Sequence, residues 1–197
     1  MGDTLRVTSH QYPPSTLDSL WVGRRVRLRA IEPQEWQRYR DFDHNSADQR
    51  NVDRVHPPRS VAGYERWANE QALRDQGDEF WLAIADVETD RPVGSISTSR
   101  VDHTAGVYWY GVGIFREDQR RGYASEAIRI VQRYMFGERR FQKCQAGVYG
   151  DNPASLGLHQ SLGFVQEGRL RKAVYHDGRH QDLVIFGMTV DEFRNLR

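Results

Sequence analysis

The stretch Gln119-Arg120-Arg121-Gly122-Tyr123-Ala124 lies between a β-rich run at 107–115 and a long amphipathic run at 122–136. Its small residues let a ligand approach the backbone. The free N–H groups and the dipole at the start of a helix attract anions. The two arginines can add charge-assisted contacts to phosphate oxygens. The stretch therefore predicts an anion site at a strand-to-helix junction. Taken by itself, the six-residue motif is also compatible with an ordinary loop that bears exposed arginines.

Other elements extend outward from this junction. The run at 107–115, the helix and a β-rich run at 142–149 form a crossover unit, whose two strands should be parallel. Upstream, the runs at 80–87 and 93–99 join 107–115 in an antiparallel meander. The remaining expected elements are a strand within 22–31, a helix from Pro33, a helix after Ser60, a short helix at 153–161, and a hairpin of 164–175 with 180–189 that turns at Asp177-Gly178.

These elements predict a mixed α/β fold. A chain of 197 residues suits one domain, which we place at 21–197. Residues 1–20 show no sustained periodicity and are interpreted as an N-terminal arm. P-loop and dinucleotide-binding folds lose their main support, because neither of their glycine-rich phosphate motifs is present.

A second motif follows the crossover unit. Asn152 is followed three residues later by Ser155, seven residues later by His159, and then by Gly163-Phe164. Asn152 before Pro153 is also typical of a helix N-cap, and the cap is compatible with a ligand contact.

Together the two motifs resemble the GNAT N-acetyltransferase superfamily. The first is similar to its Q/R-x-x-G-x-G/A signature and the second to its N-x-x-A/S-x-x-L-Y-x-x-L-G-F segment. The continuation to Ala127 looks like the branch that includes ribosomal-protein N-terminal acetyltransferases and spermidine acetyltransferases. The resemblance extends from about Val22 to Val190. It implies a central, mostly antiparallel sheet, opened by a splay between two parallel strands, with helices on both faces.

The resemblance also implies acetyl-CoA as co-substrate. The pyrophosphate would bind at the first motif, and the pantetheine arm would contact the second motif and the splayed strand, where Gly111 and Gly113 permit close approach. The predicted cofactor-binding residues are Val112, Ile114, Gln119, Arg120, Arg121, Gly122, Tyr123, Ala124, Asn152 and Ser155.

Acetyl transfer requires a neutral amine, an oxyanion donor and, optionally, an acid for the departing thiolate. Many relatives carry Tyr where this chain has His159, and histidine can donate a proton near neutral pH. His159 is therefore the candidate catalytic residue, with a histidine on the helix surface as the alternative. The usual Glu of the branch is replaced by Trp109, which leaves the general base unassigned. Candidate replacements are Glu79, Asp102, His103, His176 and Asp177, or a water chain.

The predicted reaction is direct transfer of acetyl to a primary amine, which is a peptide N-terminus, a polyamine or a small amino compound. Residues 33–75 and the hairpin turn at Asp177 are expected to border the acceptor, and acidic side chains there are candidates for attracting a cationic amine: Asp41, Asp43, Asp48 and Asp53. The alternatives are a non-catalytic acyl-CoA-binding or sensor module and a transferase for a longer acyl-CoA.

Composition bears on partners and location. The 28 basic and 27 acidic residues nearly cancel, so no nucleic-acid or membrane partner is expected. The single cysteine, Cys144, indicates a reducing, cytoplasmic setting. We expect no metal, because a turn separates His176 from His180. A homodimer, the simplest homo-oligomer, is a possible assembly.

Overall fold

The computed structural model describes residues 19–74 and 77–196. Most of the N-terminal arm expected at 1–20 lies outside these residues, so that interpretation stays a prediction.

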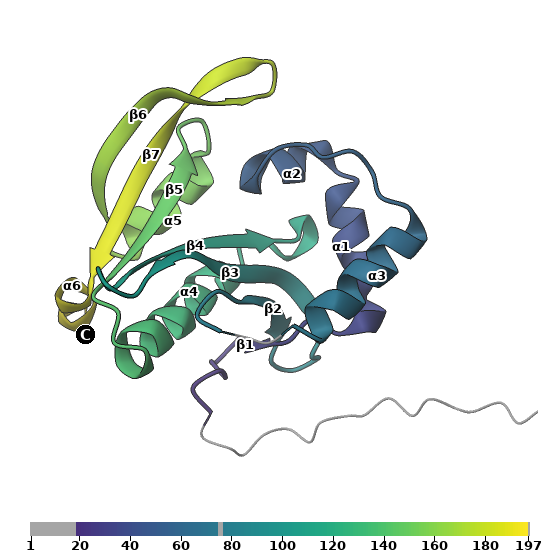
Figure 1. Cartoon of the computed structure of the whole chain (residues 1–197), viewed down its shortest axis with the longest axis horizontal. Coiled ribbons are helices and arrows are strands. Elements are labelled where there is room, and N and C mark those ends of the chain that lie inside the picture. Colours follow the sequence, from purple (N-terminus) through teal and green to yellow (C-terminus); the bar gives the residue numbers. More distant parts are fainter. Residues whose placement is uncertain (1–18, 75–76, 197) are drawn as a thin grey trace, which may run out of the picture.

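Seven strands form one sheet in the order β1-β2-β3-β4-β5-β7-β6 (Figure 1). Each neighbouring pair is antiparallel except β4 with β5, which is parallel. The strands are β1 (Val26–Arg29), β2 (Trp81–Asp86), β3 (Pro92–Asp102), β4 (Val107–Ile114), β5 (Lys143–Tyr149), β6 (Val165–His176) and β7 (Arg179–Thr189). The predicted mixed α/β class, the meander and the parallel crossover are confirmed.

The parallel pair opens after three residues of each strand. The last pair in register is Trp109 with Gln145. Beyond it, β4 continues along β3 as far as Ile114, while β5 continues along β7 as far as Tyr149. The two strands therefore diverge, and this splay is the one implied by the family resemblance.

The helices predicted from the sequence are present at 36–43, 61–72, 123–133 and 153–161. Two were missed. α2 has no apolar periodicity and is capped by the side chain of Asn45, and α6 is a single short turn closed by a Thr189–Glu192 capping box. The helical elements are η1 (Pro33–Glu35), α1 (Trp36–Asp43), α2 (Ser46–Val52), α3 (Val61–Ala72), η2 (Arg116–Asp118), α4 (Tyr123–Arg133), η3 (Tyr134–Glu138), α5 (Pro153–Ser161) and α6 (Val190–Asn195).

Helices cover both faces of the sheet, as the alternation along β2 shows. Leu82 and Ile84 belong to the larger core, which includes Ile128 of α4. Ala83, between them, belongs to a smaller core with Tyr39 of α1. Since successive strand residues point to opposite faces, α4 and α1 cover opposite sides of β2. Figure 1 shows the α1–α3 segment beside the strands on the side away from α4.

The hairpin of β6 and β7 turns as predicted. Asp177 and Gly178 both have positive φ, at 51° and 75°. This is the backbone that a type I′ turn requires. The hairpin completes the sheet beyond β5 and forms its outer edge.

Candidate functional site

The predicted anion site lies at the start of α4. Gly122 is the N-cap of the helix, with φ 80° and ψ 5°, a left-handed backbone that favours glycine. Arg120 also has positive φ, at 62°. The side chain of Tyr123 turns into the core, where its hydroxyl donates to Asp86 at 2.7 Å. Tyr123 can therefore contribute to an anion site only through its backbone.

Two residues that the sequence did not reveal hold this junction. The carboxylate of Glu126 accepts hydrogen bonds from the backbone N–H groups of Arg24, at 2.6 Å, Arg25, at 2.8 Å, and Val26, at 3.2 Å. In return, the Arg25 guanidinium donates to the carbonyl of Arg121 at 2.9 Å. The same guanidinium fills the place where a Cβ on Gly122 would lie. The partners are about a hundred residues apart, so no local pattern could have shown them.

Asp118 anchors the segment just before the junction. Its carboxyl is 1% exposed, and it accepts hydrogen bonds from Arg91 at 2.5 and 2.9 Å and from Arg38 at 3.1 Å. Arg121 is more distant, at 3.9 Å. This cluster joins η2 to the beginning of β3 and to α1, and so fixes the loop that carries Gln119 to Arg121.

The splayed side of β4 presents backbone polar groups. The N–H of Phe115 donates to Val93 of β3 at 2.9 Å. Since N–H and C=O groups alternate sides along a strand, those of Val112 and Ile114 point away from β3, toward β5. The amide of Gln119 donates to the Ile114 carbonyl at 3.2 Å. Three of the predicted cofactor residues thus lie along one side of β4.

The second motif faces the splay from the opposite side. Asn152 caps α5, because its Oδ1 accepts from the Ser155 N–H at 3.0 Å. Its Nδ2 donates to the Asn51 carbonyl at 3.2 Å, which ties α5 to the end of α2. The N-cap interpretation of Asn152 is confirmed, and the second N–H of its amide donates to no residue within 19–74 or 77–196.

His159 is buried, with 3% of its surface exposed. Its ring stacks on Tyr110 and Phe186, with centroids 5.8 and 5.3 Å away. Nδ1 lies 2.7 Å from the Ser155 carbonyl, to which it can only donate, and Nε2 has no partner among the described residues. Burial lowers the pKa of His159, so the neutral ring is favoured. In that form Nε2 carries no proton and can only accept a hydrogen bond. The expectation of a helix-surface histidine is wrong.

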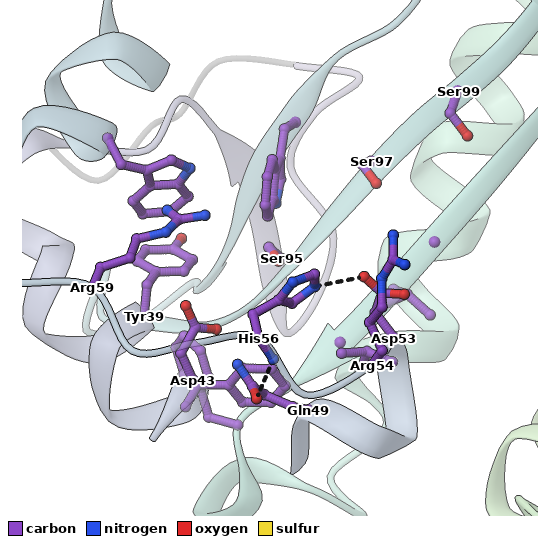
Figure 2. A pocket seen from close by; sticks show the side chains of 18 of the residues that line it. Tyr39, Asp43, Gln49, Asp53, Arg54, His56, Arg59, Ser95, Ser97 and Ser99 are labelled. Carbon is purple, nitrogen blue, oxygen red and sulfur yellow. Dashed lines mark hydrogen bonds and ion pairs between the residues drawn. The ribbon is translucent and has the colours of Figure 1, made fainter. Parts of the chain in front are cut away.

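Two cavities meet at the splay. One, of about 350 Å³, is lined by residues of both splayed strands and by Asn152, Ser155 and His159. We call it the splay cavity. The other, of about 610 Å³, lies between the α1–α3 segment and strands β2 to β4, and we call it the large cavity (Figure 2). The residues lining both are Val52, Ser97, Ser99, Arg100, Gly111 and Val112.

Trp109 lies where the two strands part. Its ring lines the splay cavity, and the Arg100 guanidinium lies 5.0 Å from the ring centroid. A Cβ on Gly147 of β5 would lie 3.5 Å from this ring. Trp109 thus fills the place of the expected Glu with an apolar surface and supplies no proton acceptor.

Of the four acidic side chains expected near an acceptor, the structure brings two into the large cavity, Asp43 and Asp53. Asp48 is instead buried against Arg116, at 2.9 Å, and Asp41 pairs with Arg40 at 2.8 Å. Burial raises the pKa of Asp43, although the Tyr64 hydroxyl donates to its carboxylate at 3.3 Å.

The candidate bases from the sequence lie elsewhere. His103 is 3.6 Å from Asp78, and Asp177 is 3.2 Å from Arg50. Glu79 accepts from the backbone of Val101, and Asp102 from that of Ala105. None of these four lines either cavity. The side chain of the fifth, His176, lies outside the described part of the chain.

Within residues 19–74 and 77–196, no group of three or more His, Cys, Asp or Glu side chains is arranged to hold a metal ion. No helix in this part is long and apolar enough to cross a membrane.

Comparisons with known proteins agree with this geometry. A family model for the acetyltransferase (GNAT) domain matches residues 25–165. The SPbeta prophage-derived uncharacterized N-acetyltransferase YokL of Bacillus subtilis (strain 168) is 36% identical over 174 residues, which are 88% of this chain and 94% of that protein. The spermidine N(1)-acetyltransferase of Vibrio cholerae is 24% identical over 165 residues, 82% of this chain and 91% of that protein.

Solved structures share the fold. The crystal structure of spermidine N-acetyltransferase from Vibrio cholerae in complex with CoA and spermine has a TM-score of 0.74 at 20% identity, covering 86% of this chain and 98% of that one.

Proposed function

This chain belongs to the acetyltransferase (GNAT) family and is an acetyl-CoA-dependent N-acetyltransferase, and we propose that its acceptor is a primary amine held in the large cavity. The observation that carries this proposal is the meeting of the two cavities at Gly111 and Val112, on the splayed side of β4. A thioester reaching this point through the splay cavity would meet an amine entering from the large one.

We place the co-substrate along the predicted residues. The pyrophosphate would lie against the backbone N–H groups of 119–124, with Arg120 and Arg121 supplying charge. The pantetheine arm would pair with the backbone of Val112 and Ile114 and reach Asn152 and Ser155 across the splay. In support, the polar groups of Val112 and Ile114 point toward β5, and one amide N–H of Asn152 has no partner in the described part of the chain.

The acceptor is a peptide N-terminus, a polyamine or a small amino compound. An amine can be held in the large cavity by hydrogen bonds to Asp43 and Asp53 and by the aromatic faces of Trp67 and Trp81. Arg54, Arg59 and Arg100 line the same cavity, so its recognition of the amine depends on these local contacts and not on net charge. The similarity to a spermidine acetyltransferase favours a polyamine among these classes. Hydrogen bonds and aromatic contacts would recognise the amine, whereas the splay would align it with the thioester.

The amine would attack the thioester carbonyl directly, and a backbone N–H in the splay would stabilise the oxyanion. His159 is the proposed acid for the departing thiolate. Because burial lowers its pKa and Nδ1 already donates to Ser155, His159 can donate from Nε2 only after it takes up a proton. We therefore propose that His159 acts as the acid only in acidic solution, and that at neutral pH the thiolate takes its proton from solvent.

A thiol-release assay with acetyl-CoA tests the proposal. The panel contains spermidine, tyramine, kanamycin and a peptide with a free N-terminus. We expect release that depends on one of these amines, together with an acetylated product of matching mass. Tight acetyl-CoA binding without release for any amine would refute it and favour an acyl-CoA sensor. Faster turnover with a longer acyl-CoA would assign a different acyl donor.

A further inference from the structure

We propose that His56, oriented by Asp53, is the general base that deprotonates the acceptor amine. This inference rests on the proposed amine acetylation, and it fills the role that Trp109 leaves open. His56 lies in the irregular segment between α2 and α3, so no periodicity or motif in the sequence indicated a catalytic role for it.

The two side chains form an exposed pair, with 51% of the His56 and 59% of the Asp53 side-chain surface accessible. The Nε2 atom of His56 lies 3.0 Å from the Asp53 carboxylate (Figure 2). This segment is anchored to α2, because the backbone N–H of His56 donates to the Gln49 side chain at 3.2 Å. Gln49 is 5% exposed, so this anchor is part of the folded interior.

The pair determines which nitrogen is free. A carboxylate only accepts hydrogen bonds, so Nε2 carries the proton and the neutral ring keeps a lone pair on Nδ1. A histidine whose tautomer is fixed by a carboxylate is a common arrangement for a general base. Among the described residues, His56 is the only histidine that lines the large cavity.

The cavity connects His56 to the splay. Ser95, Ser97 and Ser99 alternate along β3 and line the same cavity. The Ser97 hydroxyl lies 3.7 Å from where a Cβ on Gly111 would stand, next to the proposed reaction point. This row of hydroxyls can carry a proton through water between the amine and His56.

The acceptor enters as an ammonium ion and loses one proton to Nδ1 of His56. Its nitrogen attacks the thioester carbon, forming the C–N bond as the C–S bond breaks. The second proton leaves the nitrogen to solvent, and the departing CoA thiolate takes a proton from solvent. His56 then releases its proton to solvent. The charged groups around it in the cavity are Asp43 from α1, Arg54 and Arg59 from its own segment, and Arg100 from β3.

Kinetics of His56→Gln and Asp53→Asn test the assignment. For His56→Gln at pH 7 we expect kcat/KM to fall about 100-fold, the lower end of general-base effects, and for Asp53→Asn a smaller fall. Between pH 7 and 9 the kcat/KM of His56→Gln should rise about tenfold per pH unit, because only the neutral amine reacts, while the wild type stays nearly flat. The matched control is His103→Gln, which removes another carboxylate-paired histidine that lines neither cavity.

A loss that is the same at every pH would show a structural role and overturn the proposal, as would unchanged kcat/KM in His56→Gln. Failure of the wild type to acetylate any amine would instead refute the proposed function. In that event ¹⁵N NMR of the histidine rings, with the four amines added in turn, reports on the pair without turnover. A shift of the His56 Nδ1 signal that His103 does not share supports the assignment, and no shift with any amine overturns it.

Discussion

Substituting Gly122 by alanine perturbs the predicted pyrophosphate site at its most constrained point. An L-residue with φ near 80° costs about 1–2 kcal/mol. The new methyl group would also displace the Arg25 guanidinium and break its hydrogen bond to Arg121, which contributes about 0.5 kcal/mol at this exposed position. The total is about 2 kcal/mol, which in a domain of this size lowers Tm by about 4–8 °C.

The same change should weaken acetyl-CoA binding. Disturbing one backbone N–H to phosphate costs about 1.5 kcal/mol, so we expect KM for acetyl-CoA to rise about tenfold, with a smaller change in kcat. Thermal melting and steady-state thiol release measure the two effects. The matched control is Gly157→Ala in α5, where an added Cβ meets nothing within 4 Å and alanine favours the helix. Wild-type Tm and wild-type KM in Gly122→Ala would refute the assignment of the site.

Three further predictions concern buried or paired groups. Burial lowers the folded-state pKa of His159 below its ordinary 6.5, so its contribution to stability is complete above about pH 6.5 and is lost as pH falls through the folded pKa. Urea titrations at pH 5 and pH 8 should therefore show that His159→Phe loses less stability on acidification than the wild type. Equal losses in the two proteins would contradict this. Glu126→Gln should destabilise by about 1–2 kcal/mol because its carboxylate accepts three backbone hydrogen bonds, whereas Glu70→Gln, which breaks an exposed pair with Arg66, should change stability by less than about 0.5 kcal/mol. Similar unfolding curves for the two variants would show that the Glu126 contacts do not stabilise the fold. Burial raises the pKa of Cys144 to about 12, so a disulfide reagent should label it only after unfolding, and rapid labelling of the native protein would be the contrary result.

Periodicity and turn chemistry predicted most of the elements. The 153–161 helix begins and ends where the Asn152 cap and the apolar spacing place it, and the Asp177-Gly178 turn has the expected backbone. The strand observed within the predicted range 22–31 is shorter than that range, since β1 spans Val26–Arg29. α2 escaped prediction because its polar sequence shows no buried stripe, and its cap at Asn45 is visible only once the helix is known.

The sequence by itself determined the family, which is confirmed by the match over 25–165, and it predicts the co-substrate residues. Both depend on short motifs, in which a glycine, a cap and a helix start lie within a few residues of each other. Tertiary structure alone decided the favoured protonation state of His159 and which acidic side chains line the large cavity. Burial placed His159 between two aromatic rings and favoured its neutral form, and folding separated Asp43 and Asp53 from Asp41 and Asp48. Charge, exposure and proton affinity depend on neighbours distant in the chain, and so they follow from the packed fold.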